Sequence, residues 1–210
     1  MIRLIKFFLI VLLVLTIQFC QSNLYAQSNF SDSKEAIGIT YSGIGDNFSY
    51  YFQDVIGGGS YSGRGYNSFG VTYIRPLTKS LGIETGISYS KYKYEVSNAS
   101  LGPDAPEPYE ITNAVIDIPA TVRLTFLKYF FLNGGLLLGI DTEKENHLDD
   151  QTGIGALIGV GAKYDLKNTP VELFVNPYYK IHSLIPFSVD KYHIRTDESG
   201  FRFGIVYYMR

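Results

Sequence analysis

The sequence predicts an all-β fold, an eight-stranded antiparallel up-and-down transmembrane β-barrel that follows a cleaved signal peptide. Apolar residues repeatedly alternate with polar residues or glycine, and a period of two is typical of strands. Long polar connections also alternate with short turns along the chain. The composition agrees, since 18 Tyr, 14 Phe, 21 Gly and no Trp in 210 residues favour strands with aromatic rings at a membrane interface.

Residues 1–26 have the parts of a signal peptide. Arg3 and Lys6 precede an apolar run, 7–17, that is too short to span a bilayer, and a cleavage site ends at Ala26. We therefore expect the chain to be exported. Lipidation of Cys20 is the alternative, which we disfavour because a lone cysteine at the end of such a run is usually removed with it.

The expected mature domain, residues 27–210, contains no cysteine, so no disulfide can stabilise it. It also lacks a run of about twenty apolar residues, which excludes a transmembrane helix. The formal net charge of the whole chain is −2, and loss of the basic signal peptide makes the domain more acidic. A nucleic-acid partner, which needs a strongly basic face, is therefore not expected.

The first three expected strands cover residues 36–43, 68–74 and 82–96. Each places apolar residues at alternate positions, opposite Gly, Ser, Thr or Glu. The second ends at Pro76, because proline cannot donate to a strand ladder. The third gathers tyrosines over 89–94, as a membrane interface would.

The fourth expected strand, 114–126, and the seventh, 171–181, each contain a proline. A closed barrel has no free edge where a missing N–H is harmless. We therefore expect a bulge or a broken ladder bond at Pro119 and at Pro177. The eighth expected strand, 200–210, has an apolar face without charge.

The fifth and sixth expected strands, 130–140 and 154–164, form a long hairpin around the acidic loop 141–152. Phe131 and Leu137 are exceptions to the alternation in the first of them. The other apolar residues of that strand share one face: Phe130, Leu132, Leu136, Leu138 and Ile140.

A tight turn over 165–170 predicts the register of the next hairpin. It places Lys163 opposite Glu172 on the inner face, where the two charges would neutralise each other. It also places Gly161 opposite Phe174, whose ring would cover the glycine. The same register pairs Gly159 with Asn176 and Leu157 with Tyr178.

The lengths of the connections indicate the membrane. The long ones, 44–67, 97–110, 141–152 and 182–199, all fall on one side of an up-and-down barrel, and the short ones fall on the other. This is the plan of outer-membrane barrels, with short periplasmic turns and long extracellular loops. A soluble lipocalin-like barrel is the alternative, but the face opposite the apolar one carries too many charges for an apolar cavity: Glu84, Asp117, Arg123, Lys163, Glu172, Lys180 and Arg202.

Several features together resemble a known family. They are an export signal that ends in Ala-Gln, the segment Asp117-Ile118-Pro119 before a basic strand and tight turn, and the glycine-rich strand 132–140. The chain is similar over 27–210 to the outer-membrane β-barrel domain of Bacteroidota, the PorT-like group, although Arg210 departs from the usual terminal aromatic residue. The resemblance implies an outer-membrane location, and it does not imply the secretion role of PorT.

No catalytic, cofactor or metal residue is assigned. His182 and Ser183 at the extracellular rim could serve an outer-membrane lipid hydrolase, but no flanking motif supports the pair. The glycines of 57–59 and 63–65 lack the context of a phosphate loop. The acidic loop lacks the spacing of a cation site, so a solvated loop is favoured over one built from Asp141, Glu143, Glu145, His147, Asp149 and Asp150.

We therefore expect a monomeric, non-enzymatic outer-membrane protein with a structural or interaction role through the loops 44–67 and 182–199. Its expected partners are outer-membrane lipid and a protein or surface ligand at those loops. The alternatives are the lipid hydrolase and a small passive channel. The channel is disfavoured because eight strands enclose a lumen that side chains fill.

Overall fold

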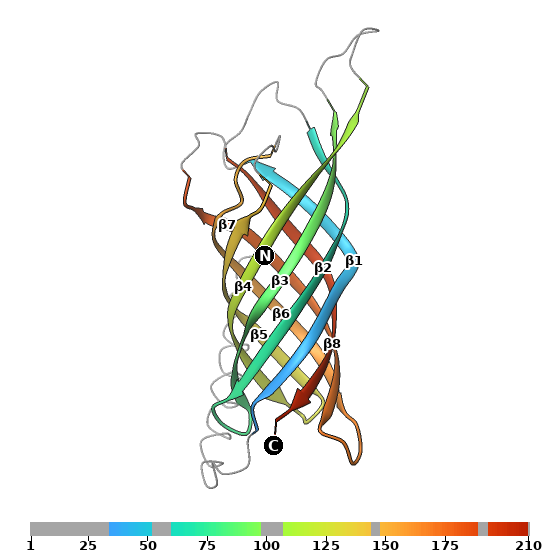
Figure 1. The fold of residues 1–210 in the computed structure, drawn as a ribbon, viewed down its shortest axis with the longest axis vertical. Coiled ribbons are helices and arrows are strands. Elements are labelled where there is room, and N and C mark those ends of the chain that lie inside the picture. The colour runs from blue at the N-terminus through green and yellow to red at the C-terminus, as the bar shows by residue number, and fades with distance from the viewer. Residues whose placement is uncertain (1–33, 52–59, 98–106, 144–147, 189–192, 210) are drawn as a thin grey trace, which may run out of the picture. The chain divides into compact units, whose positions relative to one another are not determined.

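The computed structural model describes residues 34–209 except 52–59, 98–106, 144–147 and 189–192. The signal peptide expected at 1–26 lies outside this part. Eight strands close into a barrel in which each pairs antiparallel with its sequence neighbours and β1 pairs with β8 (Figure 1). The strands are β1 (Ala36–Tyr51), β2 (Ser60–Pro76), β3 (Leu81–Ser97), β4 (Tyr109–Phe126), β5 (Phe130–Asp141), β6 (Gly153–Asp165), β7 (Val171–Pro186) and β8 (Ile194–Tyr208). No described helix is long and apolar enough to cross a membrane.

The predicted eight-stranded up-and-down fold is confirmed, but two of its loops are largely strand. Within 44–67, β1 continues to Tyr51 and β2 begins at Ser60, and β7 and β8 likewise occupy both ends of 182–199. The loop prediction failed there because the outer face of a strand meets water once it leaves the bilayer. The alternation of apolar and polar residues then disappears, although the backbone ladder continues.

Both strand prolines interrupt one ladder without a bulge. Near Pro119, β3 and β4 are paired at Thr85–Ala120 and again at Ser88–Asp117. The register is the same on both sides of this interruption. The Thr85 hydroxyl donates to the Pro119 carbonyl at 2.8 Å. The pairs of β6 with β7 show the same interruption around Pro177. The broken ladder bond was predicted correctly, and the register shifts lie elsewhere.

The predicted register of β6 against β7 is wrong by two residues. Lys163 lies opposite Phe174, and Glu172 lies opposite Asp165. The predicted inner faces are nevertheless correct, and Lys163 reaches Glu172 diagonally, with Nζ 2.7 Å from Oε2. A slip of two residues preserves the faces of a strand, so the alternation alone could not exclude it.

Aromatic cover of glycine is present with different partners from those predicted. The Phe131 ring of β5, not Phe174, lies over Gly161, and Phe174 lies over Gly204 on β8. Phe131 is fully buried, which explains why it departs from the apolar outer face of its strand. Leu137, the other exception, is 2% exposed and also lies inside.

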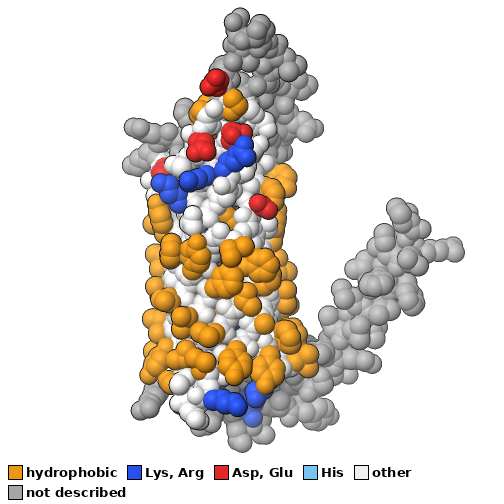
Figure 2. All heavy atoms as spheres, turned by 90° about the vertical axis from the view of Figure 1, so that its right-hand side faces the viewer, with side chains coloured by type: hydrophobic (Ala, Val, Ile, Leu, Met, Phe, Trp, Pro, Cys, Tyr) orange, Lys and Arg blue, Asp and Glu red, His pale blue; other side chains and the backbone are white. Residues whose placement is uncertain are grey.

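Apolar side chains form a broad band on the face of the barrel that Figure 2 shows, and exposed apolar side chains occur on all eight strands. Ile39, Phe69 and Ile205 are among its most exposed members, with more than half of each side chain accessible. Charged side chains are concentrated inside the barrel and beyond the band. This is the arrangement of a protein that spans the outer membrane.

Candidate functional site

The lumen of the barrel is the densest cluster of charged side chains among the described residues. At its periplasmic end, the fully buried carboxylate of Glu172 accepts hydrogen bonds from Arg123 and Lys163, each at 2.7 Å. The Tyr208 hydroxyl donates to the same carboxylate at 2.5 Å. Three donors therefore hold one carboxylate, as a buried charge requires.

A second carboxylate, Glu84 on β3, lies above this group. Arg202 of β8 pairs with Glu84 at 2.8 Å and also donates to Asn176 at 3.1 Å. Arg123 approaches Glu84 at 3.9 Å, and its guanidinium lies 3.9 Å from the centroid of the Phe131 ring. The positive charge of Arg123 is therefore stabilised by an aromatic ring as well as by carboxylates.

The central part of the lumen is built around Lys180 on β7. Its ammonium lies 2.9 Å from Asp117 and 2.8 Å from Glu198. The hydroxyls of Tyr92 and Tyr178 donate to the two carboxylate oxygens of Glu198. Strands on opposite sides of the barrel are thereby tied together across the lumen.

The lumen charges balance. Four cations, Arg123, Lys163, Lys180 and Arg202, are paired with four carboxylates, Glu84, Asp117, Glu172 and Glu198. A cavity of about 40 Å³ remains beside Lys180 and Tyr178. That volume holds a few water molecules and is not a passage.

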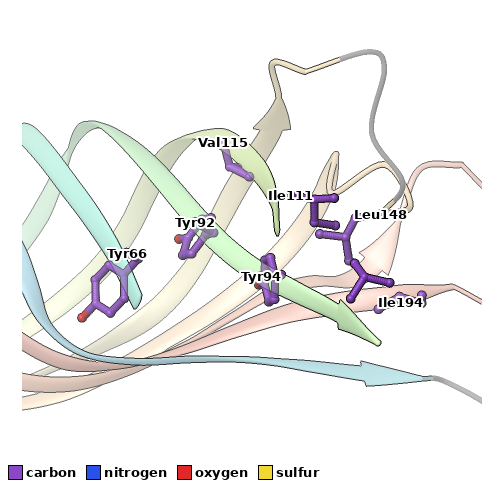
Figure 3. Close-up of a cluster of buried hydrophobic side chains, with 8 residues drawn as sticks. Tyr66, Tyr92, Tyr94, Ile111, Val115, Leu148 and Ile194 are labelled. Carbon is purple, nitrogen blue, oxygen red and sulfur yellow. The ribbon is translucent and has the colours of Figure 1, made fainter. Parts of the chain in front are cut away.

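An apolar cluster lies on the extracellular side of these ion pairs (Figure 3). Tyr92 is common to both groups, and Leu148 contributes from the segment between β5 and β6. The Gln151 side chain holds this segment against β8, because its amide donates to the Ile194 carbonyl and accepts from the Thr196 N–H. The cluster consists of Tyr66, Tyr92, Tyr94, Val96, Ile111, Val115, Leu148 and Ile194.

The predicted pair His182 and Ser183 does not form a catalytic unit. His182 points into the lumen, where Nε2 lies 3.1 Å from Asp117 Oδ1 and Nδ1 lies 3.2 Å from the Thr196 carbonyl. Ser183 has a φ of 46° and its hydroxyl instead lies 3.1 Å from Nε2 of His193. The structure therefore does not bring His182 and Ser183 together as the base and nucleophile of a hydrolase.

Sequence reasoning missed the contact between Ser183 and His193, because the two residues come together only when β8 folds back against β7. A serine beside a histidine can act as a nucleophile when substrate reaches it. Here the Ser183 side chain is fully buried and His193 is 2% exposed. The arrangement therefore gives a substrate no access to the hydroxyl.

The acidic residues around the β5–β6 connection cap backbone amides. Asp141 accepts from the N–H groups of Glu143 and Gln151, both at 3.0 Å. Asp149 accepts from the Ile194 N–H at 2.6 Å. Glu145 and His147 lie outside the described residues. Within the described chain, no group of three metal-binding side chains occurs.

The glycine-rich segment 63–65 does not form a phosphate loop. Residues 57–59 lie outside the described part, whereas 63–65 belong to β2 and contain its register shift against β3. Arg64 within this segment pairs with Glu95 at 2.7 Å.

Comparison with known proteins agrees with the barrel. The family model described as "Outer membrane protein beta-barrel domain" matches residues 25–206. No curated protein matches the chain. Similar solved structures include the outer membrane protein OprG of Pseudomonas aeruginosa, which is 12% identical over 85% of this chain and 97% of that one with a TM-score of 0.48.

Two further solved structures are similar at the same low level. The outer membrane protein AlkL, solved in DMPC bilayers, is 11% identical over 88% of this chain and 94% of that one, with a TM-score of 0.49. The outer membrane protease OmpT of Escherichia coli is 10% identical over 86% of this chain and 98% of that one, with a TM-score of 0.38.

Proposed function

The chain belongs to the family of outer-membrane protein β-barrel domains, and we propose that it is a closed, non-catalytic member that acts through its extracellular end. Its role is structural or interactive, and its partner is a protein or a surface ligand. The outer membrane supplies the lipid around its apolar band.

The observation that supports this proposal is the closed lumen. Balanced ion pairs fill the centre of the barrel, and the apolar cluster around Tyr92 and Tyr94 lies above them. Breaking buried pairs to admit a solute costs several kcal/mol per uncompensated charge. A passive channel, the alternative function, therefore has little support.

The extracellular end offers a surface of paired strands instead. The strands β1 to β4 continue past the apolar band, where β1 is paired with β8, and β3 is paired with both β2 and β4. Arg64 and Glu95 form an exposed ion pair on this extension. Loops held by such a scaffold are common positions for binding residues.

Four finer properties belong to the same proposal. The chain is a monomer, it does not bind nucleic acid, and the resemblance carried by Asp117-Ile118-Pro119 supports membership of the PorT-like group of Bacteroidota, which does not imply the secretion role of PorT. Residues 1–26 are removed on export. N-terminal sequencing of the purified protein tests this last point and should begin at Gln27.

The interaction role can be tested by crosslinking on intact cells. A photoreactive amino acid replaces Ser62, which is exposed on the extension of β2, or Lys79, which is exposed in a periplasmic turn. We expect an adduct of defined mass at position 62 and none at position 79. No adduct at position 62, or the same adduct at both positions, would contradict the proposal.

A further inference from the structure

The outer wall of β3 changes from apolar to basic at one level. Ile83, Ile87 and Tyr89 point outward and are exposed within the apolar band. The next two outward residues are Lys91 and Lys93, both exposed. Inward residues between them, such as Tyr92, are buried, so the direction of both lysines is fixed by the strand.

This change occurs at the height where acyl chains end. A strand that rises about 3.3 Å per residue at a tilt of about 40° advances about 2.5 Å along the barrel axis. The span from Leu81 to Lys91 therefore covers about 25 Å, the height of the apolar band in such barrels. On β2, the residue paired with Lys91 is Asn67, where the outward face also becomes polar.

Two carboxylates lie near the lysines, because Glu95 is two residues beyond Lys93 on β3 and Glu110 of β4 is paired with Glu95. Neither lysine has an ion-pair partner among the described residues, whereas nearby Arg64 is paired with Glu95 at 2.7 Å. The backbone beneath them is held in place, because the Lys93 carbonyl accepts a hydrogen bond from the Asn47 side chain at 2.9 Å. Two positive charges are thus presented on a fixed surface at the headgroup level.

We propose that Lys91 and Lys93 form a binding site for the phosphate group of an outer-leaflet glycolipid. An ammonium group is a strong hydrogen-bond donor to phosphate, and two of them two residues apart on one strand face can contact the same anion. Tyr89 lies directly below on the same face, where its ring can pack on the acyl chains. A lipid fits this position better than a soluble protein because the site adjoins the apolar band.

The site can be tested with the full mature protein in detergent. Native mass spectrometry measures retention of a lipid with a phosphorylated glucosamine headgroup and of the same lipid after dephosphorylation. The variants are Lys91→Gln with Lys93→Gln, Lys91→Arg with Lys93→Arg, and Lys79→Gln as a control for loss of charge at the periplasmic end. An unchanged heat-dependent shift on gels verifies that each variant is folded.

We expect the wild type to prefer the phosphorylated lipid and the double glutamine variant to lose that preference, by a factor of about five per lysine. The double arginine variant and Lys79→Gln should keep it. Equal retention of both lipids by the wild type would overturn the site, as would a preference that survives the double glutamine change or is lost equally with Lys79→Gln. The crosslinking at position 62 is independent of these outcomes.

Discussion

The side-chain amide of Asn47 on β1 donates to the Lys93 carbonyl on β3, across the bulged part of β2. The Asn47 amide oxygen also accepts from the Gly65 N–H of β2 at 2.8 Å. The ladder between β1 and β2 ends at the pair Ser42–Ser68. Within the described residues, one buried asparagine therefore joins three strands where backbone pairing stops.

Replacement of Asn47 by alanine should loosen this part of the wall. Two buried hydrogen bonds are lost, so we expect local opening of 44–51 and 60–67 to become easier by about 1–3 kcal/mol. Hydrogen exchange of backbone amides measures this directly. Ser49→Ala, which removes one hydrogen bond to the Tyr61 carbonyl, is the matched control and should have a smaller effect. Identical exchange in the Asn47 variant and the wild type would show that the asparagine does not hold the strands together.

Glu172 should matter more to stability than its partner Lys163. Glu172→Gln removes the closest carboxylate of both Arg123 and Lys163, which then have only Glu84 at 3.9 Å and Asp165 at 3.6 Å, at a cost of about 3–5 kcal/mol. Lys163→Met should cost less, because Arg123 and Tyr208 still hold the carboxylate and Lys163 is partly exposed. Equilibrium unfolding in urea with lipid vesicles provides the free energies. The reverse order of stabilities would contradict the assigned network.

Two glycines provide a test of the packing inside the barrel. A Cβ at Gly161 would overlap the Phe131 ring and lie 2.8 Å from the Val175 carbonyl, and the ring cannot move freely under Arg123. We expect Gly161→Ala to lower the free energy of unfolding by about 1–3 kcal/mol. Gly134→Ala should change it little, because its nearest neighbour would be 3.4 Å away. Equal effects of the two changes would mean that Phe131 does not cover Gly161.

The sequence predicted the barrel because lipid imposes a period of two on the outer face of every strand. The same reasoning identified the inward charges, including Lys163 and Glu172, since an inner face needs no apolar residues. It could not predict the register between them, because a slip of two residues leaves the pattern unchanged. It also could not predict the length of β1, where water on the outer face removes the pattern.

The site was less predictable than the fold for a related reason. The contact of Ser183 with His193, like that of Lys180 with Asp117 and Glu198, joins residues far apart in the chain. Such contacts depend on barrel closure and tilt, which the spacing of residues along one strand does not determine. The adjacent pair His182 and Ser183 suggested a catalytic unit, but successive residues of a strand tend to point to opposite faces.

The lumen is closed by its own side chains, and conductance across planar bilayers tests this closure most directly. Purified protein should insert without producing stable current steps, while a porin inserted by the same procedure gives them. We expect this result because the ion pairs around Lys180 and the cluster around Tyr92 fill the described part of the lumen, where the cavity beside Lys180 has a volume of about 40 Å³. Reproducible current steps that grow with salt concentration would contradict the account and support a channel.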